Sequence, residues 1–224
     1  MKVGVTLLLL FSLSLVHAID DDIELYTANN NYDYLLLATE WAGTICKAQK
    51  CSYAGGINRN FFNIHGLWPS QFKNPTSPAN CAQWNVLVSK YIQSGTKQNL
   101  ARYWSGLFSS MDAFHSHEWL KHGSCWNSQP NQIDAFFKLA MNLASRYNAY
   151  ALLSHAGIFP GKSYPLKNIL QALHNGYKVN GFSVDCANGY LKGVRVCLNK
   201  SYKIINCPQG QKASCPQMVN YPAL

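Results

Sequence analysis

The chain has 224 residues, carries 19 Lys and Arg against 10 Asp and Glu for a formal net charge of +9, and is 48% hydrophobic. No internal repeat, low-complexity tract or long linker divides it, so one continuous domain with its own core fits best. A positive surface favours polyanions such as nucleic acid, although many secreted proteins are basic for solubility alone. Charge is therefore compatible with nucleic-acid binding without establishing it.

The first residues have the composition of a secretory signal. A mostly apolar run, Val3 to Leu15, follows Met1-Lys2, and Val16-His17-Ala18 fits the small-residue cleavage pattern. A membrane anchor is the alternative, but it needs roughly 20 apolar residues, and polar residues end this run too early. No later segment could span a bilayer. We expect removal of residues 1–18, leaving one mature domain of residues 19–224, secreted or delivered to the lumen of a vacuole or lysosome.

All eight cysteines lie in the mature chain, and an even number behind a secretory signal indicates disulfides. Eight cysteines allow on the order of a hundred pairings. Chain order makes Cys46 with Cys51 a natural small loop and groups the last four near the C-terminus. The sequence has no CxxC pair, which argues against a zinc ribbon. Asn199-Lys200-Ser201 is the one N-glycosylation acceptor that proline does not block.

Hydrophobic patterns predict strands towards both ends of the mature chain and a helix between them. Tyr34 to Thr39 has strand length, and the segment around His65 predicts a second strand that ends at the active site. Ser70 to Asn80, rich in Pro, Ser and Asn, predicts a surface loop. A helix that ends near Asn148 is predicted by apolar residues at helical spacing, and three further strands are predicted later. The helical positions are Ile133, Phe136, Phe137, Ala140, Leu143 and Tyr147, and the strands are 182–184, 191–198 and 202–205. The order predicts an α+β fold, a central antiparallel sheet with packed helices.

A nine-residue segment, His117 to Cys125, holds two imidazoles, a carboxylate and an ammonium within six residues. If residues 116–123 form an α-helix, about 100° per residue places Glu118 and His122 on one face, flanked by Lys121 and with His117 at the edge. The glycine at position 123 would then end the helix. The spacing H-E-x-x-x-H differs from the H-E-x-x-H of zinc proteases, whose two histidines share a helical face.

His65 lies in an apolar segment that would fix its position, and with His122 it suggests a two-histidine acid/base site. Such a pair suits cleavage of RNA by its own 2′-hydroxyl: a base takes the 2′ proton, an acid protonates the leaving 5′ oxygen, and cations stabilise the charged phosphorus. That reaction requires no metal or cofactor. His155 and His174 lack charged neighbours in the sequence and are interpreted as structural.

Two motifs at these residues resemble those of the ribonuclease T2 family, F-x-I-H-G-L-W-P and H-E-W-x-K-H-G-T-C. They correspond to Phe62–Pro69 and His117–Cys125, in the family's order and spacing. Tyr34 to Trp41 also looks like the family's first core strand, and the Cys-rich end resembles its C-terminal region. The resemblance implies cleavage of single-stranded RNA to 2′,3′-cyclic phosphates and then, more slowly, to 3′-phosphates, with low base specificity.

The resemblance also implies residue roles. His65 is the general acid and His122 the general base, while Glu118 and Lys121 stabilise the transition state and His117 and Lys121 bind phosphate. The tryptophan at position 68 stacks on the base preceding the cut, with a plain core role as its alternative. The implied disulfides are Cys46 with Cys51, Cys81 with Cys125, Cys186 with Cys215, and Cys197 with Cys207.

Four departures from the family pattern concern specificity more than catalysis. Ser70 stands where many members have an acidic residue, so a carboxylate contact to the base is absent and base preference is in doubt. Phe114-His115 replaces the common F-W, and Glu40-Trp41-Ala42 replaces the usual Q-W-P. Ser124 in place of Thr keeps the hydroxyl. None of them removes an acid, base or phosphate-binding group.

We therefore expect a monomeric, metal-independent endoribonuclease that acts on RNA and has no membrane span. A catalytically silent recognition or storage protein of the same fold is the first alternative, and the presence of both His65 and His122 argues against it. A metal hydrolase using His115, His117 and His122 is the second, supported only by the alternating His115-x-His117 pair.

Overall fold

The computed structural model describes the chain in five stretches: 31–52, 56–73, 78–82, 87–207 and 215–224. The expected signal peptide, residues 1–18, lies outside the described residues. Within those stretches no helix combines the length and apolar character needed to cross a membrane.

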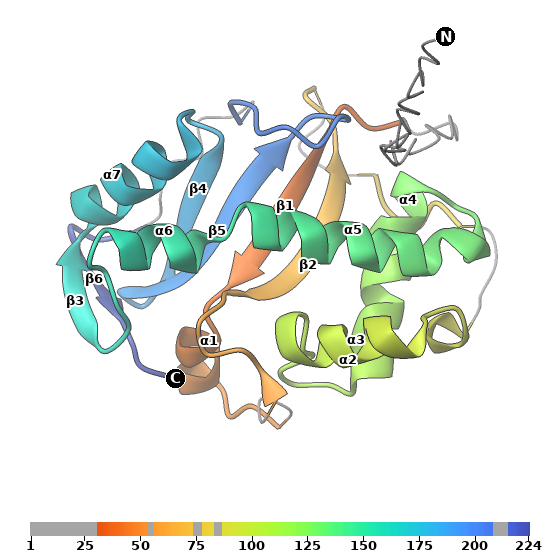
Figure 1. Ribbon diagram of the computed structural model, residues 1–224, viewed down its shortest axis with the longest axis horizontal. Coiled ribbons are helices and arrows are strands. Elements are labelled where there is room, and N and C mark those ends of the chain that lie inside the picture. The colour runs from red at the N-terminus through yellow and green to blue at the C-terminus, as the bar shows by residue number, and fades with distance from the viewer. Residues whose placement is uncertain (1–30, 53–55, 74–77, 83–86, 208–214) are drawn as a thin grey trace, which may run out of the picture.

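A six-stranded sheet forms the centre of the described part of the chain (Figure 1). Its order is β2-β1-β5-β6-β3, and β4 pairs with β5. The pairings are antiparallel except for a short parallel one between β5 and β6. The α+β fold with a central, mainly antiparallel sheet is thus confirmed. The strands are β1 (Tyr34–Glu40), β2 (Asn63–Ser70), β3 (Lys162–Pro165), β4 (Phe182–Ala187), β5 (Tyr190–Leu198) and β6 (Met218–Tyr221).

The helices are distributed unequally around this sheet. Two of them, α5 and α6, run across one face, while α2 and α3 lie at the β2 end and α7 near β4 (Figure 1). The helices are α1 (Ala42–Ala48), α2 (Ser94–Tyr103), α3 (Met111–Glu118), α4 (Ser124–Trp126), α5 (Ile133–Arg146), α6 (Ala149–His155) and α7 (Leu166–Tyr177), with a π-helical turn η3 (Trp119–Gly123) and 3-10 turns η2 (Val88–Lys90) and η4 (Pro130–Gln132).

The main core lies between the sheet and α5. Because side chains alternate along a strand, Leu35 and Leu37 of β1 point to this side and are fully buried, together with apolar residues of α5. Tyr34, Leu36 and Glu40 therefore project from the opposite side, which we call the outer face. Trp68 of β2 lies on the same face, because it pairs with Leu36. The predicted helix is confirmed, with the buried positions Ile133, Phe136, Phe137, Ala140 and Leu143.

One strand prediction is wrong. Residues 202–205 form no strand and contribute one isolated bridge, Leu198 to Ile204. The reason is a turn: Tyr202 has φ +58°, and the Asn199 Oδ1 accepts hydrogen bonds from the backbone N–H groups of Ser201 and Lys203. The strand predicted around His65 is β2, which runs through His65 and Trp68 to its last residue at position 70. Neither β3 nor β6 was predicted.

Four disulfides hold the structure together, and their pairs are those that the family resemblance implies. One closes the small loop after α1, and a second ties α4 to the chain before α2. The other two hold the C-terminal segments to β4 and β5. The pairs are Cys46–Cys51, Cys81–Cys125, Cys186–Cys215 and Cys197–Cys207.

Candidate active site

A β-bulge sets the position of His65. Ala38 of β1 pairs with Gly66, but the next residue, Thr39, pairs with Ile64, so His65 is an extra residue in β2. Bulges are frequent next to active sites because they redirect a side chain. Here the bulge brings the imidazole to the outer face, where its ring centroid lies 5.1 Å from that of Trp68. The bulge thus places two motif residues side by side.

A buried relay supports the backbone of the bulge. The Trp104 indole Nε1 donates to the His65 carbonyl at 2.9 Å. His115 Nε2 lies 2.8 Å from the Trp104 carbonyl, and because a carbonyl only accepts, that nitrogen carries the proton. His115 is almost fully buried, and burial lowers its pKa. His115 therefore packs in the core and, through Trp104, supports the backbone of His65.

The second motif does not form the uniform α-helix that the sequence predicts. Helix α3 begins at the N-cap Ser110, whose side chain accepts from the Ala113 N–H, and ends at Glu118, after which a π-helical turn carries Lys121 and His122. Such turns often occur at functional sites. Gly123 was expected to end the helix, but it has helical angles and α4 follows it directly.

Close packing explains that glycine. A Cβ at Gly123 would lie 2.5 Å from the Trp119 ring and 2.9 Å from the Phe136 ring. The following Ser124 fixes the turn, because its hydroxyl donates to the Leu120 carbonyl at 2.7 Å and accepts from the Cys81 N–H at 3.1 Å. The hydroxyl at position 124 therefore works with the adjacent disulfide to hold the segment.

Trp68, a residue of the first motif, contacts two residues of the second motif. Its indole Nε1 donates to Glu118 Oε2 at 3.0 Å, and its ring centroid lies 5.2 Å from that of His122 with the planes tilted by 34°. A Cβ at Gly66 would meet both the indole nitrogen and the Glu118 carboxylate, so glycine is required beneath this bond. The half-buried indole is a shared surface of the site and not part of the main core.

A carboxylate that the motifs did not identify completes the site. Glu40, the last residue of β1, places Oε2 3.3 Å from His65 Nδ1, and its side chain is 15% exposed. The sequence marked this residue only as a departure from Q-W-P. An Asp or Glu at an outer-face position of a strand beside the histidine strand is the signal that could have identified it.

The two central histidines have opposite electrostatic environments. Burial lowers the pKa of His65, but the hydrogen bond and charge of Glu40, helped by Glu118, outweigh both this effect and the charge of Lys192, so its pKa is raised. Burial and then the charge of Lys121, with smaller effects from neighbouring histidines, lower the pKa of His122 to about 4. The His122 Nδ1 is buried and has no hydrogen-bond partner among the described residues, so its charged form would bury an N–H without an acceptor. Near pH 6, one ring favours the proton and the other lacks it.

The two remaining charged groups lie around this pair. Burial raises the pKa of Glu118 to about 7, against the opposing hydrogen bond from Trp68 and nearby positive charges. Burial, followed by the charges of Lys121 and His65, lowers the pKa of the exposed His117. The predicted catalytic residues are therefore close enough to influence one another's protonation.

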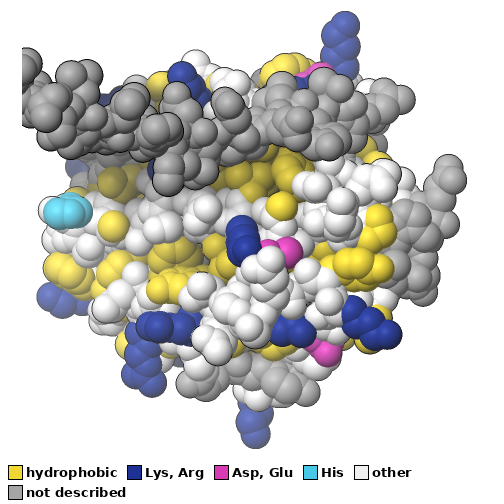
Figure 2. Space-filling model, turned by 45° about the vertical axis from the view of Figure 1, so that its right-hand side comes forward, with side chains coloured by type: hydrophobic (Ala, Val, Ile, Leu, Met, Phe, Trp, Pro, Cys, Tyr) yellow, Lys and Arg dark blue, Asp and Glu magenta, His cyan; other side chains and the backbone are white. Residues whose placement is uncertain are grey.

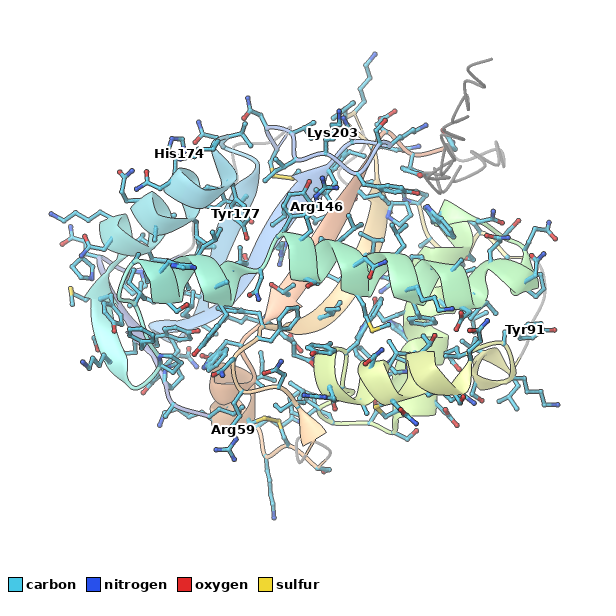
Figure 3. The ribbon with its side chains drawn as sticks, in the orientation of Figure 1. Arg59, Tyr91, Arg146, His174, Tyr177 and Lys203 are labelled. Carbon is cyan, nitrogen blue, oxygen red and sulfur yellow. A yellow bond between two sulfur atoms is a disulfide. The ribbon has the colours of Figure 1, made fainter. Side chains whose placement is uncertain are left out.

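Other histidines lie outside this group. His174 is on α7, at the other end of the molecule from α3 (Figure 3), and His155 is the last residue of α6. The alternative metal-hydrolase hypothesis also requires His115 as a ligand, but this side chain is hydrogen-bonded to the Trp104 carbonyl as described above. Across the described stretches, no three or more His, Cys, Asp or Glu side chains are grouped as a metal ion would require.

Comparisons with known proteins identify the family and the relatives of this chain. The model of the Ribonuclease T2 family matches residues 32–207. Ribonuclease 1 of Arabidopsis thaliana is 32% identical over 211 residues, covering 88% of this chain and 89% of the relative. Extracellular ribonuclease LE of Solanum lycopersicum is 30% identical over 212 residues, covering 89% and 91%. The solved structure of RNase NT in complex with 5′-AMP has a TM-score of 0.76 at 26% identity, covering 87% of this chain and all of that one.

The fold, the site and these relatives define the class of protein as an endoribonuclease. The chain belongs to the ribonuclease T2 family.

Proposed function

We propose that the protein cleaves single-stranded RNA by transphosphorylation, with His122 as general base and His65 as general acid. The observation that carries this proposal is the opposite shift of the pKa values of the two histidine rings that lie beside Trp68. A base must start without its proton and an acid must start with it. The environments of these two rings favour that combination between pH 4 and the raised pKa of His65.

The reaction begins when His122 takes the proton of a ribose 2′-hydroxyl and the oxygen attacks the adjacent phosphorus. His65 then protonates the departing 5′ oxygen, which leaves a 2′,3′-cyclic phosphate on one product. With the roles reversed, water opens the cyclic ester more slowly to a 3′-phosphate. Two proton transfers by positioned histidines account for the chemistry through this chain's own residues.

Negative charge on the phosphoryl oxygens is stabilised by the groups around the two rings. Lys121 supplies positive charge, both Lys121 and His117 supply N–H donors, and below about pH 7 the carboxyl of Glu118 is protonated and can donate as well. Glu40 orients His65 through Nδ1, which directs the other ring nitrogen towards the leaving group. These are the transition-state and phosphate-binding roles that the family pattern implies.

Base recognition is assigned to Trp68. An aromatic face accepts any base by stacking, and the indole is held by Glu118 at the centre of the site. Ser70 is almost fully buried and its hydroxyl donates to the Trp68 carbonyl at 3.1 Å, so it offers no carboxylate to a base amino group. Low base specificity follows from stacking without such a contact.

Export belongs to the same proposal. Cleavage after Ala18 would release a mature chain that enters the secretory pathway, where its four disulfides form. Secretion and delivery to a vacuole or lysosome are both compatible with this route. Asn199 is a candidate glycosylation site, and its side-chain oxygen caps an exposed turn. N-terminal sequencing and intact-mass analysis of the secreted protein test both modifications, and an unprocessed N-terminus contradicts the first.

The deciding experiment incubates purified, oxidised protein with short RNA and matched DNA in excess EDTA, followed by mass spectrometry of the products. We expect cleavage of RNA alone and 2′,3′-cyclic phosphate ends. Activity that EDTA abolishes would overturn the metal-independent mechanism. No cleavage by a folded sample would favour a silent binding protein of the same fold.

A further inference from the structure

A stacked aromatic pair lies on the outer face beyond Trp68. The rings of Tyr34 and Phe72 have centroids 5.3 Å apart and planes inclined by only 17°. Neither residue packs in the main core, and Phe72 is 50% exposed. The Phe72 ring therefore presents surface to solvent while Tyr34 supports it from the other side of the stack.

The register of β1 and β2 places this pair in line with the proposed active site. Leu36 pairs with Trp68, and two residues earlier Tyr34 pairs with Ser70. Two residues of a strand span about 7 Å. Along the outer face the order is thus His65, Trp68 and then the aromatic pair. If an RNA strand places one base on Trp68, the next base in the direction away from the cut can reach the aromatic pair.

The segment that carries Phe72 is fixed before any ligand binds. The Asp33 N–H donates to the Ser70 carbonyl at 2.7 Å, and Asp33 Oδ2 accepts from the Phe72 N–H at 2.8 Å. The Gln71 side chain donates to the Asn31 carbonyl at 2.7 Å. A preorganised ring loses little conformational freedom on binding, which is a property of a stacking platform.

Charge around the pair is also compatible with a nucleic acid. Lys73, next to Phe72, is exposed, and the ammonium of Lys200 lies 4.9 Å from the ring centroid of Tyr32. Figure 2 shows a different side of the molecule, the side on which α5 lies, and basic side chains are spread there too with few acidic ones among them, in keeping with the net positive charge of the chain. Lysines beside stacked aromatic rings are the combination with which proteins hold single strands without reading sequence.

We propose that Tyr34 and Phe72 form a second stacking platform, which binds the base one nucleotide to the 5′ side of the base on Trp68. The proposal rests on the proposed function, because that function places the cleaved nucleotide at Trp68. The platform extends recognition to a longer single strand and makes the enzyme prefer substrates with a nucleotide upstream of the cleaved one.

Chimeric oligonucleotides with a single ribose test this proposal, because only the bond after that ribose can be cut. Three substrates are compared: a dinucleotide, the same with one deoxynucleotide added at the 5′ end, and the same with one added at the 3′ end. A base stacked on an aromatic side chain contributes enough binding for about a fivefold effect or more. We expect the 5′ addition to raise the kcat/KM of the wild-type enzyme. We expect Phe72→Ala to reduce that gain by about fivefold or more.

Matched variants separate this role from a structural one. Phe159 is 46% exposed in the segment between α6 and β3, so Phe159→Ala removes a similar exposed ring elsewhere and should leave all three rates unchanged. Phe72→Trp keeps an aromatic face and should retain the 5′ preference. An equal loss on all three substrates, or a loss confined to the 3′ addition, overturns the platform.

A binding measurement distinguishes failure of the platform from failure of the proposed function. A fluorescent, all-deoxy pentanucleotide cannot be cleaved, so its affinity does not depend on catalysis. We expect Phe72→Ala to weaken its binding by about fivefold or more. If the wild-type protein cleaves no substrate, the proposed function fails while this affinity difference still supports the platform. Equal affinities for wild type and variant overturn the platform, whether or not RNA is cut.

Discussion

His65 and His122 are the same residue type, have ring centroids 5.1 and 5.2 Å from that of Trp68, and differ mainly in what surrounds them. His65 is on a sheet bulge with a carboxylate 3.3 Å from its ring. His122 is on a π-helical turn, surrounded by positive charge and with a buried nitrogen that has no partner among the described residues. In the proposed mechanism the neighbours decide which ring holds the proton, so the division into acid and base lies in the environments and not in the imidazoles.

Removing either ring tests the comparison most severely. General acid or base catalysis contributes roughly a hundredfold to ten-thousandfold, so we expect His65→Ala and His122→Ala each to lower kcat by at least about a hundredfold. His174→Ala, an exposed histidine on α7, is the matched control and should leave the rate unchanged. Steady-state kinetics measure the effect, and circular dichroism checks folding. A folded variant with near-native turnover would falsify the assignment.

Substitution of Lys121 tests the effect of positive charge near His122. In the proposed mechanism its ammonium stabilises the transition state, so Lys121→Ala should lower kcat by about tenfold or more while RNA affinity changes less. The same change removes a positive charge that lowers the pKa of His122, so the acidic limb of the pH–rate profile should move to higher pH. Lys167→Ala on α7 is the control for loss of one exposed lysine. An effect confined to affinity contradicts the catalytic role.

Substitution of Glu40 tests the effect of the carboxylate beside the other histidine, His65. Because its hydrogen bond and charge raise the pKa of His65, Glu40→Gln should lower that pKa, since an opposite charge beside the ring favours its charged form. The alkaline limb of kcat/KM then moves to lower pH and the rate above that limb falls, whereas the rate at acidic pH changes little. NMR titration of the His65 ring gives the pKa directly.

A matched control for that experiment lies on the same sheet. Asp185→Asn removes one carboxylate, but its partner is Arg195, 2.7 Å away, so the alkaline limb should stay in place. An unchanged His65 titration in Glu40→Gln shows that the ion pair does not set the protonation of the acid.

Sequence reasoning predicted what depends on local pattern. The α5 helix and β1 follow from periodicity over one segment, and the two motifs located His65, His122 and their charged neighbours. The long-range disulfides came from family resemblance, because spacing alone left many pairings open. The bulge could not be read from β2, since it exists only in the register with β1.

The same limit explains the contacts that were missed. The ion pair between Glu40 and His65 joins residues that become neighbours only when two strands pair. The π-helical turn and the continued helix after Gly123 depend on Trp119 and Phe136, whose rings occupy the space beside the glycine. Local propensity describes a segment by itself, whereas these features result from packing against another segment.

The smallest effects we predict are on stability. Glu118 and His122 should change the free energy of unfolding in opposite directions as the pH changes. Burial lowers the pKa of His122 to about 4, below the ordinary histidine value of about 6.5. Between these values the unfolded chain binds more protons, so the contribution of this ring to stability is lost as pH falls from about 6.5 to about 4. Burial raises the pKa of Glu118 to about 7 from a model-peptide value of about 4.3, so the contribution of its carboxyl is lost as pH rises through that window.

These two contributions partly cancel in the wild-type protein, and single variants should separate them. Relative to wild type, the free energy of unfolding of Glu118→Gln should rise with pH between about 4.5 and 7, because the carboxyl's opposing contribution is gone. That of His122→Gln should fall with pH between about 4 and 6.5. Urea titrations at several pH values measure both differences. Two slopes of the same sign would show that the carboxyl and the imidazole do not have the opposite proton preferences on which the acid/base assignment depends.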